Sequence, residues 1–200
     1  MISYGKQSID QEDIDAVLDA LQSDWLTQGP HVEKFENNLN NYFGSKYSCA
    51  LSNGTAALHL SGLACGWQEN DIIITSPITF LASVNSILYS GATPEFVDID
   101  NTSYTIDPNL VEEKVKMQRL RGKNVKAIIA VDFAGHPCDW NALKYIADKY
   151  ELKLINDNCH AMGAKYKNKK NYAIMYADIV TQSYHAVKHI TTGEGGAVLT

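Results

Sequence analysis

The chain has 200 residues, 45% hydrophobic and 20% charged, which is enough to bury the core of one domain, or of one domain plus part of another. Its 17 basic and 23 acidic residues give a net charge of −6, with none of the basic faces typical of nucleic-acid-binding proteins. The lysine-rich segment 166–172 is interpreted as a solvated loop. The polar residues 1–10 predict no secretory signal, and the apolar runs are too short to span a membrane.

The four cysteines are scattered, and no two of them have C-x-x-C spacing. We interpret them as reduced thiols that mostly pack as small hydrophobic side chains, which is typical of a cytoplasmic protein. Cys159 and His160 could form a metal site with His185 and His189, but no recognised zinc spacing connects them. We therefore predict no metal.

Residues 10–24 predict the first helix, with Asp10 as a plausible N-cap. Its apolar residues recur at helical spacing and share one face. They are Ile14, Val17, Leu18 and Leu21.

A second helix is predicted over residues 31–43. Val32, Phe35 and Leu39 form its apolar stripe, which either Tyr42 or Phe43 continues. Gly44 is expected to end it, because glycine readily adopts the left-handed conformation that follows many helices.

From residue 47 onward, strand patterns alternate with helix patterns. Strands are predicted over residues 47–52, 71–76, 94–99, 125–133, 152–157, 178–184 and 196–200. Helices are predicted over residues 55–65, 78–91, 109–120 and 141–150. This alternation, with nearly continuous apolar strands, favours an α/β fold in which helices cover both faces of a mainly parallel sheet. The last strand should be antiparallel, because a turn without a crossover helix precedes it.

Ligands of such sheets bind at the carboxyl ends of the strands, so the loops there are the candidate site. In the loop 52–55, Gly54 opens a helix whose free N–H groups and positive dipole end suit a phosphate. The alternative is an ordinary strand-to-helix turn capped by Asn53 or Ser52. The patterns GxxxxGK and GxGxxG are both absent.

Three further residues in these loops have both a structural and a functional interpretation. Asp157 ends an apolar strand, where it could cap a helix or meet a ligand nitrogen. Phe80 could be a core aromatic or a ring stacked on a flat cofactor. Lys188 could be a solvated charge, a phosphate contact or a covalent nucleophile.

Taken together, the phosphate cradle, the carboxylate, the aromatic ring and the late lysine match the requirements of pyridoxal 5′-phosphate (PLP). The lysine would form a Schiff base with the PLP aldehyde. The aspartate would keep the pyridine nitrogen protonated, so that the ring withdraws electrons.

Four segments, in this order, resemble the sugar aminotransferases of the DegT/DnrJ/EryC family: SNGTAALHL (52–60), SPITFLAS (76–83), NDNCHAMGA (156–164) and SYHAVKHITTGEGG (183–196). The resemblance runs from about residue 3 to the end of the chain. It implies PLP as cofactor and the aspartate-aminotransferase (type I) fold, with residues 1–200 forming an N-terminal segment and the PLP-binding large domain. It also implies that the C-terminal small domain of the family is absent from this chain.

The resemblance also implies roles for individual residues. Lys188 matches the lysine that forms the aldimine with PLP, and Asp157 matches the partner of the pyridine nitrogen. Gly54, Thr55 and Ser183 match phosphate contacts.

Two further matches have less direct roles. Phe80 matches the aromatic residue that stacks on the cofactor, and His160 falls beside the ring. Relatives that act as dehydratases have a histidine at the lysine position, so Lys188 argues against that branch. Asn156 departs from the family, which usually has an acidic residue just before the aspartate.

Within the family, YGKQSI, SDWLTQGP and VDFAGHP most resemble the branch that serves pseudaminic-acid biosynthesis. That similarity implies a UDP-linked 4-keto-6-deoxy-N-acetylamino sugar as substrate, glutamate as amino donor and a homodimer for the full-length form. No membrane or nucleic acid is expected as a partner. The alternatives are an aminotransferase for another nucleotide-linked keto sugar, or a truncated remnant without catalysis.

Overall fold

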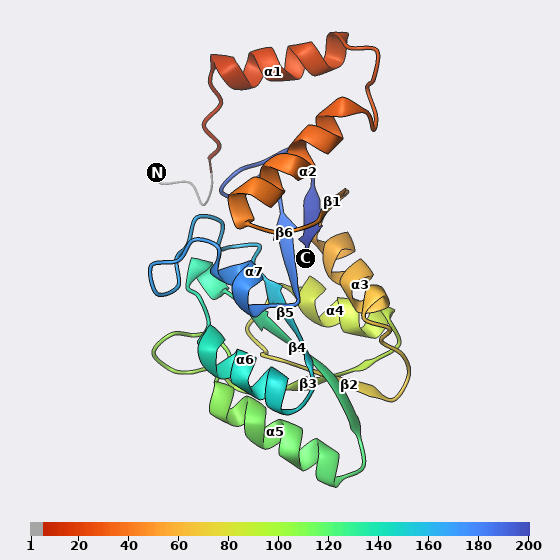
Figure 1. Cartoon of the computed structure of the whole chain (residues 1–200), viewed down its shortest axis with the longest axis vertical. Coiled ribbons are helices and arrows are strands. Elements are labelled where there is room, and N and C mark those ends of the chain that lie inside the picture. Colours follow the sequence, from red (N-terminus) through yellow and green to blue (C-terminus); the bar gives the residue numbers. More distant parts are fainter. Residues whose placement is uncertain (1–5) are drawn as a thin grey trace.

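The computed structural model describes residues 6–200, which form one seven-stranded sheet with helices on both faces (Figure 1). The strands are β1 (Ser48–Leu51), β2 (Asp71–Thr75), β3 (Thr93–Phe96), β4 (Asn124–Val131), β5 (Lys153–Asp157), β6 (Ile179–Ser183) and β7 (Gly196–Leu199). Across the sheet their order is β1-β7-β6-β5-β4-β2-β3. The predicted fold class and the number of strands are confirmed.

Strands β2 to β6 are parallel to one another, whereas β7 is antiparallel to both of its neighbours, β6 and β1. The reason lies in the connection before β7. The N–H of Tyr184 donates to the carbonyl of Gly195 at 2.8 Å, so the chain folds straight back beside β6 without a crossover helix. The predicted antiparallel last strand is therefore confirmed. The carboxyl ends of β4, β5 and β6 lie at one edge, where ligands bind in such sheets.

Two groups of helices cover the two faces of the sheet. The helices are α1 (Gln11–Gln22), α2 (Pro30–Phe43), α3 (Gly54–Ala64), α4 (Leu81–Tyr89), α5 (Pro108–Leu120), α6 (Trp140–Lys149) and α7 (Tyr172–Tyr176), with a short 3-10 turn at Phe133–Gly135. In Figure 1, α3 and α4 lie on one side of the sheet and α5, α6 and α7 on the other. No helix within residues 6–200 is long and apolar enough to cross a membrane.

The core consists of two buried clusters separated by the sheet. Successive residues of a strand point to opposite faces. Ile128 of β4 accordingly packs in the cluster of α5 and α6, while Ile129 packs with Ile87 of α4. In β5, Leu154 belongs to the first cluster and Ile155 to the second. The same alternation directs a side chain at position 157 toward α4.

The first helix begins as predicted, but the structure does not bury its apolar face. The carboxylate of Asp10 accepts hydrogen bonds from the amides of Glu12 and Asp13 at 2.9 and 3.1 Å, which makes it the N-cap. No residue of α1 is buried. Its four predicted core-type residues are 44–61% exposed: Ile14, Val17, Leu18 and Leu21.

The second helix packs on the body of the protein. Gly44 ends it at φ 72°, in the left-handed region, as predicted. Of the two candidates for the end of the apolar stripe, Phe43 is buried and Tyr42 is exposed. Glu36 also covers the edge strand β1, because its carboxylate accepts a hydrogen bond from the amide of Ala50 at 2.7 Å.

Three details differ from the sequence-based expectations. Helix α4 begins at Leu81 rather than at residue 78, because Phe80 has extended backbone angles. The segment 166–172 is not wholly solvated: its lysines are exposed, but Tyr172 is buried and opens the unpredicted helix α7. All four cysteines are free, yet only Cys138 is fully buried.

Candidate functional site

Asp157 is the last residue of β5 and lies at the carboxyl edge of the sheet. Its side chain is only 4% exposed, on the face that α4 covers. The hydroxyl of Ser83 on α4 donates to one carboxylate oxygen, Oδ2, at 2.6 Å, and the amide of Cys159 donates to Oδ1 at 3.3 Å. Two donors from separate elements thus hold a buried carboxylate in a defined orientation.

The beginning of α3 lies beside the end of β6. Asn53 caps this helix, since its side-chain oxygen accepts a hydrogen bond from the amide of Ala56 at 2.8 Å. The amides of Gly54 and Thr55 have no hydrogen-bond partner among residues 6–200. Two free amides at a helix N-terminus, with the Ser183 hydroxyl nearby, are suited to an anion such as phosphate.

Glycine at position 54 is required by this close approach. A Cβ atom there would lie 2.9 Å from the Cβ of Ser183 and 3.4 Å from the sulfur of Cys159. Any larger residue would push β6 away from the helix N-terminus. The structure therefore brings together Gly54, Thr55 and Ser183, for which the family resemblance implied phosphate contacts.

Lys188 lies in the compact turn that connects β6 to β7. Its amide donates to the carbonyl of His185 at 2.9 Å, and the amide of Thr192 donates to the carbonyl of Tyr184 at 3.0 Å. Lys188 is half-buried, whereas His185 is exposed. The turn holds the lysine beyond the end of β6, which is adjacent to the strand that carries Asp157.

The pKa values of two neighbours indicate the surroundings of Lys188. Burial lowers the pKa of the half-buried His160 imidazole, and the positive charge of Lys188 lowers it further, while Asp157 acts in the opposite direction. Burial raises the pKa of the Cys159 thiol well above its usual range, Asp157 adds to the rise and Lys188 opposes it. Asp157 and Lys188 therefore act on the same two side chains, so the structure gathers these four residues in one region.

Phe80 does not lie in the core. It stands just before α4 in the loop that follows β2, and its side chain is 68% exposed. A core aromatic would be buried, so this interpretation is wrong. The ring remains free to meet a ligand.

The model of the DegT/DnrJ/EryC1/StrS aminotransferase family matches residues 7–200, the range that contains the anion cradle, the held carboxylate and the lysine turn. The chain belongs to this family.

Individual family members show how far the similarity extends. A UDP-4-amino-4,6-dideoxy-N-acetyl-beta-L-altrosamine transaminase of Campylobacter jejuni is 43% identical over 200 residues, which are 100% of this chain and 51% of that protein. The structure of Helicobacter pylori PseC, an aminotransferase involved in pseudoaminic acid biosynthesis, matches with a TM-score of 0.84 and 36% identity, over 99% of this chain and 52% of that one.

A further solved structure that this chain matches is a sugar aminotransferase in its pyridoxamine 5′-phosphate (PMP) form. Spr1654 of Streptococcus pneumoniae has a TM-score of 0.90 and 30% identity, over 99% of this chain and 52% of its own. Its PLP form matches equally well. The present chain thus spans about half the length of the relatives that it matches.

Two residues that contact the segment around Asp157 were not singled out from the sequence. The first is Ser83, which holds Asp157. The second is a buried carboxylate, Asp132, directly after β4, with no exposed surface. Burial raises its pKa, and hydrogen bonds from the Cys138 amide, Tyr172, Asn158 and Asn156 act against that rise. The bond between Ser83 and Asp157 spans 74 positions, and those from Asn156, Asn158 and Tyr172 to Asp132 span 24 to 40, so no local pattern of residues predicts them.

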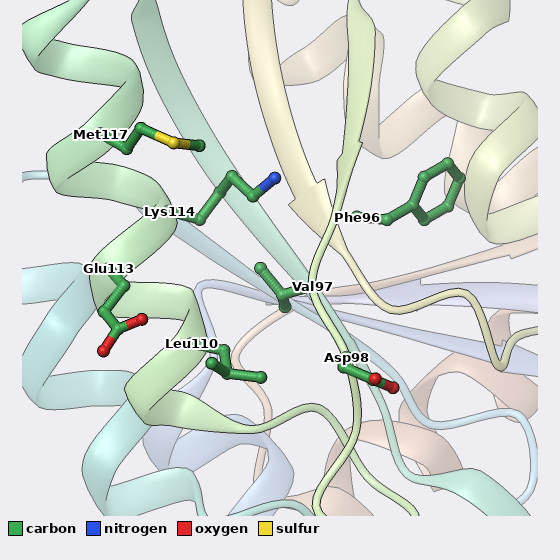
Figure 2. A pocket seen from close by; sticks show the side chains of 7 residues that line it. All are labelled: Phe96, Val97, Asp98, Leu110, Glu113, Lys114 and Met117. Carbon is green, nitrogen blue, oxygen red and sulfur yellow. The ribbon is translucent and has the colours of Figure 1, made fainter.

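Two other features lie outside the site. A groove of about 470 Å³ between β3 and α5 contains no predicted site residue, and its Lys114 is paired with Glu95 at 3.1 Å (Figure 2). The groove is lined by Phe96, Val97, Asp98, Leu110, Glu113, Lys114 and Met117. Within residues 6–200, no cluster of three or more His, Cys, Asp or Glu side chains could hold a metal ion.

Proposed function

We propose that residues 1–200 form the N-terminal segment and the PLP-binding large domain of a sugar-nucleotide aminotransferase, whose C-terminal small domain lies outside this sequence. The family membership and the match to half the length of each relative support this division. The PMP and PLP forms of a structural relative support the cofactor.

The described residues fit PLP at both of its polar ends. The free amides of Gly54 and Thr55, with the hydroxyl of Ser183, would hold the phosphate. Asp157, buried beneath α4, would accept a hydrogen bond from the pyridine nitrogen. Phe80, exposed at the start of α4, would stack on the ring.

When bound, PLP supplies an aldehyde that takes up amino groups and a ring that withdraws electrons. Asp157 would hold the proton on the ring nitrogen, because a buried carboxylate stabilises a positive charge beside it. Lys188 would bond covalently to the PLP aldehyde through its Nζ. Once released as a free amine, it would carry a proton between the substrate carbon and the cofactor. His160, whose pKa is lowered by burial and by Lys188, would lie beside the ring as a neutral imidazole.

For the whole protein we propose transfer of an amino group from glutamate to a UDP-linked 4-keto-6-deoxy-N-acetylamino sugar, in pseudaminic-acid biosynthesis. The 43% identity to the Campylobacter transaminase and the 36% identity to PseC support this substrate. We further propose a cytoplasmic homodimer for the full-length form. If the reading frame continues beyond Thr200, the protein from the complete frame should aminate the UDP-linked sugar in preference to GDP- or dTDP-linked keto sugars. A preference for another nucleotide would contradict the substrate assignment.

The observation that carries the proposal is the buried Asp157 carboxylate, which the Ser83 hydroxyl holds at the end of β5, on the strand next to the one that leads to Lys188. The test is titration of the chain with PLP, followed by visible absorbance. We expect weak binding, with no measurable transamination by residues 1–200 alone. Borohydride reduction followed by peptide mapping should place the cofactor on Lys188.

Two variants and one control make the assignment specific. Lys188→Ala should keep non-covalent binding through the phosphate cradle but lose the covalent label. Asp157→Asn should keep the label and change the absorbance of the bound cofactor. Lys167→Ala, at an exposed lysine in the loop before α7, should behave like the parent chain. A label on any other lysine would contradict the assignment of Lys188.

A further inference from the structure

We propose that Asp132 is a positioning residue. It holds Asp157 in place by accepting hydrogen bonds from Asn156 and Asn158, the residues on either side of Asp157. This role rests on the proposed function of Asp157 as the partner of the cofactor nitrogen. Asp132 itself does not reach the cofactor site, because it lies behind the sheet strand that carries Asp157.

The contacts of Asp132, which directly follows β4, reach strand β5 and two helices, α6 and α7. Its Oδ2 accepts hydrogen bonds from Asn156 at 3.2 Å and from Asn158 at 2.9 Å. Tyr172 of α7 donates to the same oxygen at 2.7 Å. Trp140 of α6 and the Cys138 amide donate to Oδ1 at 3.0 and 2.9 Å.

This cluster holds the end of β5 from one face of the sheet, as a clamp, because successive residues of a strand point to opposite faces. Asn156 and Asn158 point to the α6 and α7 side of the sheet, while Asp157 between them points to the α4 side. The two asparagines are fully buried, and Gln182 of β6 also donates to the Oδ1 atom of Asn158 at 2.5 Å. Both neighbours of Asp157 are thus held from behind, and its own carbonyl accepts a hydrogen bond from the Asp132 amide at 3.2 Å, so that Ser83 has only to orient the carboxylate.

Asn156 shows that this arrangement is costly for stability. Its Nδ2 reaches Asp132, but its own Oδ1 is buried without a hydrogen-bond partner among residues 6–200. An unpartnered buried oxygen destabilises a fold. An acidic residue at this position would place a second carboxylate about where Nδ2 lies, 3.2 Å from an oxygen of Asp132, so the amide is the group that this site accepts.

The test is amide hydrogen exchange in the chain without cofactor, because the Cys159 amide donates to Asp157 and reports on its position. Asn156→Leu removes the donor without adding a charge. We expect exchange at Cys159 to become about tenfold faster relative to Ile129 in the core strand β4. Tyr172→Phe, which removes one hydroxyl, should act in the same direction and serves if Asn156→Leu does not fold. The control Ile146→Val on α6 should change both amides equally. If Asn156→Leu and Tyr172→Phe also change the exchange rates of the Cys159 and Ile129 amides by equal factors, the proposal is overturned.

A second measurement links the clamp to the proposed function. Asn156→Leu should weaken PLP binding about tenfold in the parent chain but leave it unchanged in an Asp157→Asn background, since residues that act through one another are not additive. Equal losses in both backgrounds would overturn the positioning role. If the parent chain fails to bind PLP, the proposed function fails, while the exchange measurement still decides whether Asp132 positions Asp157.

Discussion

Ser83 and Asp157, 74 positions apart in the chain, are joined by a hydrogen bond of 2.6 Å from the serine hydroxyl to the carboxylate. Ser83 has no exposed surface, and Asp157 is 4% exposed. A hydrogen bond to a buried charge is among the stronger ones in proteins. This contact fastens the end of β5 to α4, so the same interaction stabilises the fold and orients the candidate site.

Ser83→Ala should therefore lower both stability and cofactor affinity. Removing the donor should cost about 1–3 kcal/mol of unfolding free energy and weaken PLP binding about tenfold. Urea denaturation and an absorbance titration measure the two effects. Ser86→Ala is the matched control, because its hydroxyl is also buried on α4 but donates to the carbonyl of Ser83 at 3.0 Å. A loss of PLP affinity as large in the control would contradict the special role of Ser83.

Gly54→Ala should damage the anion cradle. The added Cβ would lie 2.9 Å from the Cβ of Ser183, and overpacking of this kind costs about 1–3 kcal/mol. We expect PLP affinity, and affinity for inorganic phosphate, to fall about tenfold as the helix N-terminus moves from β6. Gly62→Ala also creates a clash on α3, 2.5 Å from the ring of Trp67, but far along the helix from the cradle. It should destabilise the chain without changing the affinity measured for the folded protein.

The stability of the contact between α5 and α6 should depend on pH through Glu112. Hydrogen bonds from Lys149, Lys116 and Tyr150 lower the pKa of its carboxyl from 4.5 to about 2. A lowered pKa in the folded state contributes stability above the unfolded value, and this contribution disappears as pH falls from about 4.5 toward 2. Glu112→Gln should therefore lower the urea midpoint at pH 6, and lower it less at pH 3.

The neighbouring Glu113 provides the control for this prediction. It lines the groove beside α5 and makes no ion pair within the described part of the chain. Glu113→Gln should leave the midpoint nearly unchanged at both pH values. A pH-independent effect of Glu112→Gln would show that its packing, rather than its charge, stabilises the contact.

The exposed apolar face of α1 should affect association rather than folding. Leu18 and Leu21 are 46% and 61% exposed, and no residue of the helix is buried. Leu18→Glu with Leu21→Glu should leave the urea midpoint within about 0.5 kcal/mol of the parent, which is usual for surface substitutions. Sedimentation velocity should show less self-association, because exposed apolar patches promote it. A large drop in the midpoint would mean that the monomer itself covers this face.

Much of the fold could be predicted because its signals are local. The capping carboxylate of Asp10, the left-handed Gly44 and the run of apolar residues in β4 act within a few residues of themselves. The antiparallel direction of β7 also follows from a short connection that leaves no room for a crossover. Helix α7 could not be predicted, because five residues with little local signal are helical only where Tyr172 is buried against the core.

The candidate site divides in the same way. The sequence by itself determined its chemical groups: a glycine that opens a helix, a carboxylate at the end of a strand and a lysine in a glycine-rich turn, each in a loop where such a sheet binds ligands. Only the tertiary structure decided what holds these groups in place. Ser83 and Asp132 reach the segment around Asp157 from other elements, and the exposure of Phe80 depends on how α4 packs. Hydrogen bonds between distant residues form only after the strands have assembled, so no local pattern of residues predicts them.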